Sequence, residues 1–471
     1  MRKTKIICTL GPATDDPAIL RALIEGGMNA ARFNFSHGTH AEQLERYTMF
    51  TNVRDELGAP VASILDTKGP EIRIRSFAAG KVELTAGADF TLCSGEVPGD
   101  ETRVSVTYPD LPRELQPGQT VLIDDGLIGL RVTETGGDYV RCTVVNGGPL
   151  SANKSINVPG VQIKLPAVTD KDKSDILFAV EHDFDFIAAS FVRRAADVEA
   201  IRALLREYGG EDIRIIAKIE NQEGVDNLDE ILRAADGIMV ARGDLGVEIP
   251  AARVPALQKR MIRAGLQLGK PVVTATQMLD SMMRNPRPTR AEVSDVANAV
   301  FDGTSCVMLS GETASGRYPV EALAAMVGIV GEAEAAIDFW DQVEVSRLTD
   351  ENNINDVITH ACCMAARDLG AAAIVTPTLS GRTARMISRF RPLCPIAALV
   401  TREKVRYQLA ISWGVIPCLT GEVSSTDRII HLAADVAKKE QLVQKGDVIV
   451  ITAGVPLGKS HTNLMKAHVI E

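Results

Sequence analysis

Residues 213–224 read IRIIAKIENQEG, and this stretch decides how the rest of the chain is interpreted. Residues 213–219 are mostly apolar and β-branched, which predicts a buried strand. Lys218 and Glu220 are two positions apart, so on a strand they point to the same face. Burying an ammonium or a carboxylate without a partner is costly. We therefore expect the two side chains to serve a ligand; a purely structural Lys–Glu pair is the alternative.

The residues that follow predict where this strand lies in the fold. Polar residues and a glycine end the strand, and apolar residues then recur at helical spacing at Val225, Leu228, Ile231 and Leu232. Lys218 and Glu220 thus lie at the carboxyl end of a buried strand that leads into a helix. Parallel α/β folds place their chemistry at this position.

The same strand–helix alternation occurs in two separate parts of the chain. Strands are predicted at residues 4–10, 29–35, 61–65, 184–191, 213–219, 237–241, 271–275 and 306–309. Helical patterns follow most of them, and Thr169 and Asp172 have the spacing of a capping box. Eight such units predict a closed (β/α)8 TIM barrel. An open doubly wound sheet is the alternative, and it would gather its ligands at one switch point.

The pattern changes between the third and fourth of these strands. Short alternating runs separated by tight turns predict an inserted all-β domain, a small β-barrel lid, with strands at 82–84, 90–92, 120–123, 127–132 and 139–145. A helix at 354–369 and strands at 373–376, 396–400, 415–419 and 448–451 predict a C-terminal α/β regulatory domain. We expect the barrel at residues 1–70 and 169–345, the lid at 71–168 and the last domain at 346–471.

Two loops of the last domain contain glycine next to polar residues. Residues 380–383 read SGRT between a strand and a helix, so their amides would point at an anion; a plain helix start is the alternative. Residues 454–460 read GVPLGKS and have one residue too few between the glycines for a Walker A loop. A strand pattern follows them in place of a helix, so we do not predict a P-loop.

Composition limits the classes of function. The net charge of −10 and the aromatic content of 4% argue against binding to nucleic acid or to an anionic membrane. The eight cysteines form no CxxC pair and no Cys/His cluster, which suits a reducing compartment. The sequence contains no signal-peptide pattern and no long apolar run. We expect a soluble cytoplasmic protein.

Polar residues cluster where the predicted barrel strands end. Glu220 and Asp244 are carboxylates without a nearby zinc-type ligand, which suits Mg²⁺ or Mn²⁺. Lys218 and Arg32 are cations that face the same mouth. The other polar strand ends are Asn34, Ser36, His37, Asp66, Thr67, Gly243 and Thr276. The arrangement fits phosphoryl transfer, in which cations meet the charge on the equatorial oxygens.

These strand ends resemble the pyruvate kinase family, in particular its bacterial members, and the resemblance covers essentially the whole chain. The matching blocks are IIAKIENQEGV at 215–225, RFNFSHG at 32–38, LDTKGPEIR at 65–73, NKSINVPG at 153–160, VARGDLGVEIP at 240–250, TATQML at 274–279, NPRPTRAEVSDVANAV at 285–300 and MLSGETASGRYP at 308–319. The resemblance implies the barrel, lid and C-terminal domain in this order, and usually a homotetramer.

The resemblance also implies an activity and a role for each strand-end residue. Phosphoenolpyruvate would transfer its phosphoryl group to ADP, giving pyruvate and ATP in glycolysis. Arg32 and Lys218 would hold the phosphoryl group, and Glu220 and Asp244 the divalent metal. The substrate carboxylate and enolate would lie at Gly243, Asp244 and Thr276. The expected K⁺ ligands are Asn34, Ser36, Asp66 and Thr67, and the expected nucleotide contacts are Arg73, Lys154, Asn34 and His37.

Two further expectations concern regulation. In this family a glutamate at the position of Glu71 accompanies K⁺ dependence. Ser380, Arg382 and Thr383 match a segment where family members bind an activating phosphorylated effector. The sequence leaves fructose 1,6-bisphosphate, a sugar monophosphate and AMP open as that effector.

Two other functions fit part of the pattern. A metal-dependent carbon–carbon lyase would also use Mg²⁺, carboxylates and an enolate, but it gives no reason for Arg73, Lys154 or a lid. A non-catalytic regulator that senses sugar phosphates would not need Lys218, Glu220 and Asp244 together.

Overall fold

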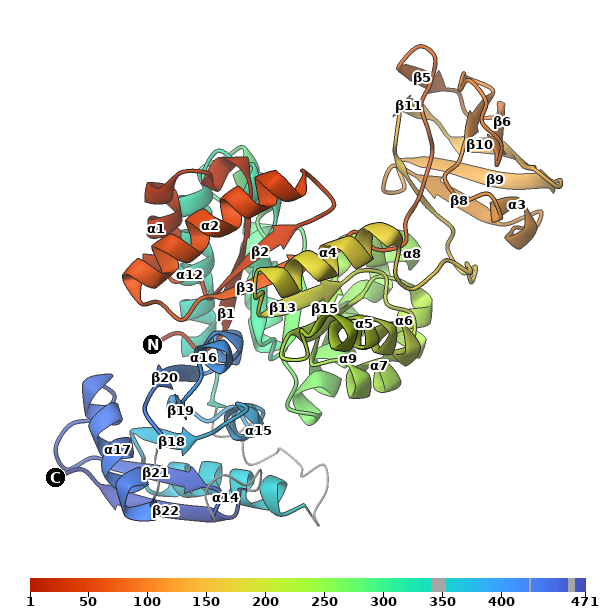
Figure 1. Ribbon diagram of the computed structural model, residues 1–471. Helices are drawn as coiled ribbons and strands as arrows, with labels where there is room; N and C mark the ends of the chain where they lie inside the picture. Colours follow the sequence, from red (N-terminus) through yellow and green to blue (C-terminus); the bar gives the residue numbers. More distant parts are fainter. Residues whose placement is uncertain (340–352, 423–424, 456–461) are drawn as a thin grey trace.

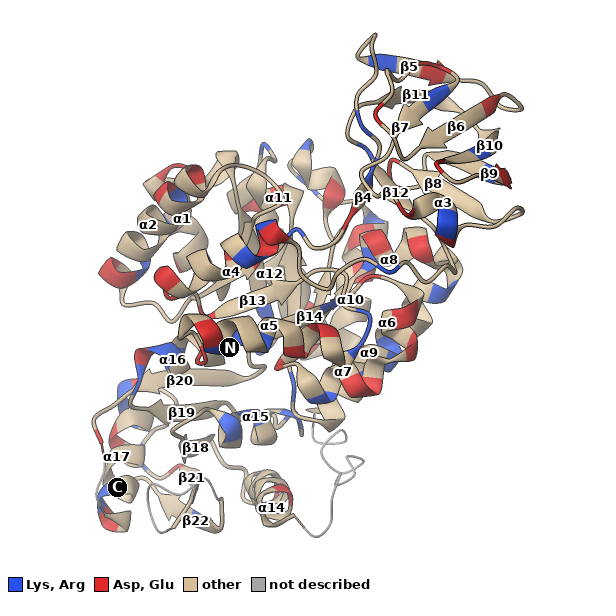
Figure 2. Ribbon diagram, turned by 45° about the vertical axis from the view of Figure 1, so that its right-hand side comes forward, with Lys and Arg blue, Asp and Glu red and all other residues tan. Residues whose placement is uncertain are grey.

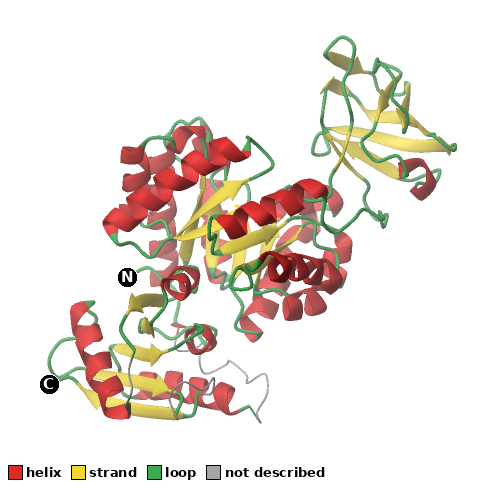
Figure 3. Cartoon of the chain, viewed as in Figure 1, coloured by secondary structure: helices red, strands yellow, loops and turns green. Residues whose placement is uncertain are grey.

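The computed structural model describes residues 1–339, 353–422, 425–455 and 462–471 and has three parts (Figure 1). A central barrel carries the lid at one end and the C-terminal domain at the other, and the N-terminus lies on the side of the C-terminal domain. Helices surround the barrel strands, whereas the lid is built of strands and loops with one short helix (Figure 3). The expected boundary at residues 345 and 346 lies outside the described residues.

Eight parallel strands in the described chain close into a barrel in the order β1-β17-β16-β15-β14-β13-β3-β2. They are β1 (Lys5–Leu10), β2 (Ala30–Asn34), β3 (Ala62–Asp66), β13 (Phe186–Ala189), β14 (Arg214–Ile219), β15 (Gly237–Ala241), β16 (Val272–Ala275) and β17 (Cys306–Leu309). Closure confirms the (β/α)8 prediction and excludes the open sheet. It also brings the carboxyl ends of all these strands to one mouth.

Helices cover the outside of the barrel, and short helices follow several strand ends. The outer helices are α1 (Pro17–Glu25), α2 (His40–Leu57), α4 (Asp170–Glu181), α5 (Ala195–Tyr208), α7 (Leu228–Ala234), α9 (Val254–Gln267), α10 (Arg290–Phe301) and α12 (Pro319–Ala335). The short ones are η1 (Pro12–Thr14), α6 (Gln222–Asp226), α8 (Arg242–Glu248), η2 (Ala251–Arg253), η3 (Asp280–Met283) and α11 (Gly311–Ala314). The predicted capping box of Thr169 and Asp172 begins α4.

Charged residues lie mainly on the outer helices and on the lid, with both signs interspersed (Figure 2). The apolar stripes of the outer helices pack on the strands and form the largest core cluster, which includes Phe33, Phe50 and Phe184. Within the described ranges, no helix combines the length and the apolar character that a membrane crossing requires.

The lid is an all-β unit, as predicted. Within residues 71–168, all of which are described, a seven-stranded sheet has the order β4-β12-β8-β9-β10-β6-β7, and β11 pairs with β5. The elements are β4 (Ile72–Arg73), β5 (Lys81–Leu84), β6 (Asp89–Cys93), β7 (Arg103–Ser105), α3 (Leu111–Glu114), β8 (Thr120–Ile123), β9 (Ile128–Thr135), β10 (Tyr139–Asn146), β11 (Gly148–Ser151) and β12 (Ser155–Asn157). An isolated bridge between Ile74 and Val106 links the two edges of this curved sheet.

The C-terminal domain is an α/β unit. In its described part, a five-stranded sheet has the order β20-β19-β18-β21-β22, and only β22 runs antiparallel to its neighbour. The elements are α14 (Ile354–Asp368), β18 (Ala373–Pro377), α15 (Arg382–Ser388), β19 (Ile396–Val400), α16 (Glu403–Leu409), β20 (Val415–Leu419), α17 (Thr426–Lys439), β21 (Val448–Ala453) and β22 (Leu464–Val469). The GVPLGKS loop falls mostly outside the described residues, but the strand predicted after it is β22.

One barrel strand departs further from its predicted range than the others do. Residues 184–191 were expected to form a strand, whereas β13 covers only Phe186–Ala189. The chain turns at its carboxyl end because Phe191 has a φ of 55°. A positive φ is uncommon for a bulky side chain and frequently marks a functional site.

Candidate active site

Lys218 is the centre of a buried polar cluster at the mouth of the barrel. It lies near the end of β14, and its Nζ is 3.0 Å from Asp66 Oδ1, 2.7 Å from Ser190 Oγ and 3.0 Å from Glu220 Oε1. Burial alone would lower the pKa of Lys218, but the charges of Asp66 and Glu220 outweigh it and raise the pKa above its ordinary value. The ammonium is therefore a fixed positive charge.

Asp66 joins Lys218 to the second predicted cation. Arg32 on β2 donates from Nε to Asp66 Oδ2 at 2.6 Å and from Nη1 to Thr9 Oγ1 at 3.0 Å. Burial favours the protonated form of Asp66, but Arg32 and Lys218 together hold its pKa below the ordinary value. One carboxylate thus orients two cations at the mouth.

Glu220 and Asp244 are the two carboxylates predicted to bind a divalent metal. Glu220 is fully buried, and its Oε2 accepts a hydrogen bond of 2.6 Å from the backbone N–H of Phe191. Its Oε1 lies within ion-pair distance of Lys218 Nζ, but the two groups are not oriented for a hydrogen bond. Burial raises the pKa of Glu220 to about 7 despite Lys218, and the charge of Asp244 adds to this rise.

Asp244, on α8, is half-buried, and its pKa is raised by burial in spite of Lys218. A divalent cation between Glu220 and Asp244 would relieve this unfavourable charge. Among the described residues, no group of three or more His, Cys, Asp or Glu side chains converges as a metal site. Mg²⁺ commonly takes one or two carboxylates from the protein and fills its other coordination positions with oxygens of the substrate and of water. Glu220 and Asp244 would supply the two carboxylates.

Ser190 and Phe191 belong to the cluster but were not predicted. The hydroxyl of Ser190 accepts from Lys218 and donates to the carbonyl of Thr67 at 2.6 Å. The positive φ of Phe191 aims its N–H at Glu220. Gly69 makes room for this turn, because a Cβ there would lie 2.8 Å from Cβ of Ser190. The only signal in the sequence is the position of Ser190 at the end of a predicted strand.

Thr276 also has an unusual backbone conformation, with a φ of 69°. Its Oγ1 accepts from the N–H of Gly243 at 2.8 Å and donates to the carbonyl of Ala275 at 2.6 Å. Arg242, which was not predicted, donates to the carbonyl of Thr276 at 2.8 Å and pairs with Asp295 at 2.7 Å. The predicted residues Gly243 and Thr276 therefore lie together, and Arg242 stabilises their turn.

The four residues predicted to bind K⁺ lie at the ends of β2 and β3. Asn34 is opposite Asp66 in the strand register, and its Oδ1 accepts from the N–H of Ser36 at 3.1 Å. Thr67 follows Asp66, and its Oγ1 accepts from the N–H of Ser190 at 3.2 Å. Asp66 already contacts two cations. In the predicted K⁺ site it would therefore mainly add negative charge to the neutral oxygens of the other three residues.

Arg73 and Lys154 lie at the two connections between the lid and the barrel, where β4 pairs with β12. Arg73 contacts both carboxylate oxygens of Glu71, at 2.7 and 3.0 Å, and the carbonyl of Asn153 at 2.7 Å. Lys154 pairs with Asp124 at 2.8 Å. The two predicted phosphate contacts are thus near each other, each paired with a carboxylate.

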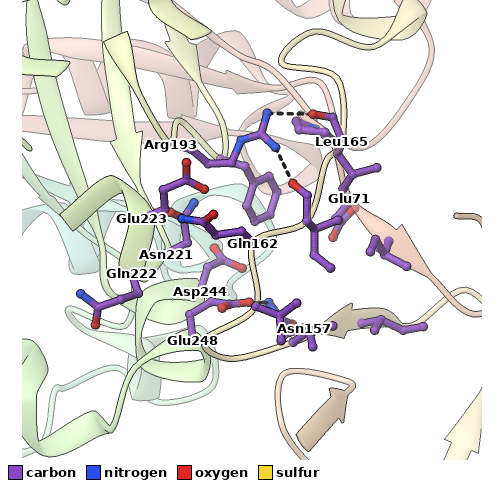
Figure 4. Close-up of a pocket in the computed structure, with 18 of the residues that line it drawn as sticks. Glu71, Asn157, Gln162, Leu165, Arg193, Asn221, Gln222, Glu223, Asp244 and Glu248 are labelled. Carbon is purple, nitrogen blue, oxygen red and sulfur yellow. Dashed lines mark hydrogen bonds between the residues drawn. The ribbon is translucent and has the colours of Figure 1, made fainter. Parts of the chain in front are cut away.

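Two cavities adjoin the mouth. One, of about 220 Å³, lies between lid and barrel and is lined by Glu71, Gln162 and Asp244 (Figure 4). Across this cavity Asn157 of the lid donates a hydrogen bond to Glu248 of α8 at 2.9 Å. Arg193 donates to the carbonyls of Ile163 and Leu165 at 2.9 Å each, in the segment that leads from the lid back to the barrel. The other, of about 860 Å³, is lined by Arg32, Asn34 and His37.

The predicted effector residues lie far from the mouth, in the C-terminal domain. Gly381 precedes α15 with a φ of 75°, and Thr383 shares a hydrogen bond of 2.8 Å with Thr462. The carbonyl of Ser380 accepts from Arg214 at 3.0 Å. Arg214 is the first residue of β14, the strand that ends beside Lys218 and Glu220.

Comparisons with known proteins place the chain in one family. A model of the pyruvate kinase barrel domain matches residues 1–323, and a model of the pyruvate kinase alpha/beta domain matches residues 356–468. Pyruvate kinase of Clostridium acetobutylicum is 52% identical over 473 residues, covering 100% of both chains. That of Geobacillus stearothermophilus is 52% identical over 473 residues, with 100% of this chain and 80% of that protein covered.

A solved structure agrees with these matches. The crystal structure of a pyruvate kinase from Cryptosporidium parvum superposes with a TM-score of 0.96 at 40% identity, and the match covers 100% of this chain and 96% of that one. Fold, mouth residues and sequence thus lead to the same conclusion. The chain belongs to the pyruvate kinase family and is a phosphotransferase.

Proposed function

We propose that the protein transfers the phosphoryl group of phosphoenolpyruvate to ADP, giving pyruvate and ATP, as a cytoplasmic enzyme of glycolysis. The observation that carries the proposal is the cluster at the mouth, where Lys218 and Arg32 share Asp66. Glu220 lies 3.0 Å from Lys218, and the charge of Asp244 also acts on Lys218. Phosphoryl transfer depends mainly on positioning and charge stabilisation, and these fixed cations supply both.

Each group at the mouth has a distinct role in this proposal. Lys218 and Arg32 hold the phosphoryl oxygens while the ADP oxygen attacks. Glu220 and Asp244 would hold Mg²⁺ or Mn²⁺, which supplies further positive charge to the phosphoryl oxygens and the enolate. The N–H groups of Gly243 and Asp244 and the hydroxyl of Thr276 would position the carboxylate of the substrate, which would replace the hydrogen bond between Gly243 and Thr276.

Protonation of the enolate completes the reaction. We propose that Thr276 delivers this proton through a water molecule, because a threonine hydroxyl is a weak acid by itself. Its hydroxyl donates to the carbonyl of Ala275, so it must turn toward the mouth to take part.

The cavity beside Arg32, Asn34 and His37 is large enough for a nucleoside diphosphate. Arg73 and Lys154 would leave their carboxylate partners for the phosphates of the nucleotide as the lid closes. Lid closure would exclude water, because hydrolysis competes with transfer to ADP.

We propose K⁺ as a second cofactor, held by Asn34, Ser36, Asp66 and Thr67. Glu71 pairs with Arg73. When Arg73 moves to the phosphates of the nucleotide, the Glu71 carboxylate loses this partner, and K⁺ would supply a balancing positive charge. A Glu71→Lys variant supplies that positive charge itself and is expected to work without K⁺. Unchanged K⁺ dependence in this variant would refute the assignment.

We further propose activation by a small phosphorylated effector at Ser380, Arg382 and Thr383. The hydrogen bond from Arg214 to Ser380 connects this segment to β14. A shift of the segment would therefore move β14 and, with it, Lys218 and Glu220.

We also propose a homotetramer. The exposed side chains of Val293 and Phe301 lie at an apolar groove between α10 and α12, and contact with another subunit would bury them.

An assay with phosphoenolpyruvate and ADP, coupled to reduction of pyruvate by lactate dehydrogenase, tests the proposed function. Activity that needs both Mg²⁺ and K⁺ is the expected result. A carbon–carbon lyase would give no ADP-dependent signal, and a non-catalytic regulator would give none at all. Repeating the assay with fructose 1,6-bisphosphate, a sugar monophosphate and AMP identifies the effector.

A further inference from the structure

A small cavity lies where the C-terminal domain meets the barrel, on the far side from the mouth. Residues from the loop before β16, from α15 and the segment after it, and from the segment after α16 line it, among them Lys270, Arg385, Arg391, Ser412 and Trp413. Its volume is about 10 Å³, which is room for one particle of the size of a water molecule.

Arg391 is the least satisfied cation at this cavity. It is 3% exposed, and its guanidinium lies 4.5 Å from the ring centroid of Trp413. One nitrogen, Nη2, donates to the carbonyl of Gly303 at 2.6 Å. Its Nε and Nη1 have no hydrogen-bond partner among the described residues, and neither has Oγ of Ser412. Three buried donor atoms at one small cavity therefore lack an acceptor.

The negative charge near Arg391 is also insufficient. Within the described chain, the carboxylate whose charge reaches Arg391 is Glu334, which already accepts from the backbone N–H groups of Lys3 and Thr4. The same carboxylate also acts on two further cations, Arg2 and the buried Lys5.

Burial lowers the pKa of Arg391 and of Arg385 to about 9 and that of Lys5 to about 8. Arg389, which also lines the cavity, forms an ion pair with Asp356 at 3.1 Å. Arginine does not lose its proton in proteins, so the excess positive charge at the cavity persists at neutral pH.

We propose that this cavity binds a monovalent, single-atom anion of the chloride type, held by Nε and Nη1 of Arg391 and by the hydroxyl of Ser412. A water molecule would fill the space but would leave the charge uncompensated. Sulfate and phosphate are too large for the cavity. These ligands belong to the C-terminal domain, and barrel residues such as Lys270 and Ser305 line the rest of the cavity. The anion would therefore stabilise the contact between the two domains.

Diffraction from crystals grown in sodium bromide tests the site directly. The expected result is an anomalous bromide peak within hydrogen-bond distance of Arg391 and Ser412. Density for water with no anomalous signal at that position would overturn the proposal.

Thermal unfolding in solution provides the second test. In sodium chloride, compared with sodium gluconate at equal ionic strength, the Tm of the wild type is expected to rise by about 2 °C or more and to saturate. An Arg391→Met variant should lose this chloride dependence, and an Arg113→Met variant, whose side chain is exposed, should keep it. An equal effect of chloride on the Tm of all three proteins would refute the site. If Arg391→Met does not fold, the bromide experiment on the wild-type protein decides the question.

Discussion

Two aspartates at opposite ends of the barrel are equally buried but have opposite electrostatic surroundings. Asp66 ends β3 at the mouth, and Asp185 precedes β13 at the base; each is 1% exposed. Asp66 contacts Arg32 and Lys218 directly, and its pKa is lowered in spite of burial. Asp185 accepts from the N–H and hydroxyl of Ser63 at 2.8 and 3.0 Å, while Lys404 remains 3.8 Å away.

Burial therefore raises the pKa of Asp185 to about 6, because Lys404 and Ser63 offset only part of the desolvation. The comparison shows that burial alone does not make a buried carboxylate functional. At the mouth, direct ion contacts keep the charges fixed and available to a ligand. At the base, Asp185 lies near Lys404 of the C-terminal domain and helps to hold that domain against the barrel.

Removing the central cation of the mouth is the strongest test of this contrast. Lys218→Met is expected to lower kcat by roughly 10³-fold or more, since the phosphoryl charge then lacks its stabilising ammonium. The matched control is Lys5→Met, which removes a buried lysine at the other end of the barrel whose Nζ donates to Val415.

The control variant should lose thermal stability and keep most of its kcat, whereas Lys218→Met should fold nearly as the wild type does. Steady-state kinetics and thermal unfolding of both variants measure this. A loss of kcat below tenfold in Lys218→Met, or a large drop in its Tm, would show that Lys218 is a structural partner of Asp66 and Glu220.

A smaller effect is expected from removing the hydroxyl that orients Lys218. Ser190→Ala deletes the 2.7 Å contact to the ammonium, and misplacement of a reacting group is expected to lower kcat by roughly 10- to 100-fold. Ser63→Ala at the base is the matched control, since it deletes a buried hydroxyl that contacts Asp185. A larger kcat loss in the control than in Ser190→Ala would contradict the positioning role.

The sequence predicted the barrel strands and their polar ends better than it predicted the short strands of the lid. The eight barrel strands follow from apolar, β-branched runs of ordinary length, and their polar ends follow from interruptions of those runs. The lid strands β4, β7 and β12 span two or three residues, which is too short to display alternation.

The contacts of the site were harder to predict than its residues. Ser190 and Phe191 act through a turn whose positive φ has no signature in their residue types, since φ above zero normally indicates glycine or asparagine. The hydrogen bond from Arg214 to Ser380 joins residues distant in sequence, so it depends on how two domains pack. Local patterns carry no information on such packing.

The contact between Arg214 and Ser380 leads to a prediction about regulation. Arg214→Ala should leave basal kcat nearly unchanged but reduce the effector-induced change in KM for phosphoenolpyruvate at least about fivefold. Arg202→Ala is the control, because Arg202 and Arg214 both pair with Asp236, at 2.8 and 3.5 Å, whereas the hydrogen bonds of Arg202 stay within the barrel. Equal activation of wild type and Arg214→Ala would exclude this connection.

The smallest expected effect concerns the pH dependence of stability at Asp185. Because its folded-state pKa of about 6 lies above the ordinary 3.8, the folded protein keeps a proton that the unfolded chain releases between these values. Asp185 thus stabilises the fold at low pH, and this contribution, roughly 3 kcal/mol, is lost as the pH rises through 6.

Asp185→Asn stays neutral at every pH and can still accept from Ser63. Its Tm relative to the wild type is therefore expected to increase between pH 5 and pH 7 in thermal unfolding series of both proteins. Asp183→Asn, an exposed neighbour that also contacts Lys404 at 2.6 Å, is the control and should show no such trend. Parallel curves for Asp185→Asn and the wild type would mean that Lys404 already compensates the charge of Asp185, and the contrast between the two ends of the barrel would then disappear.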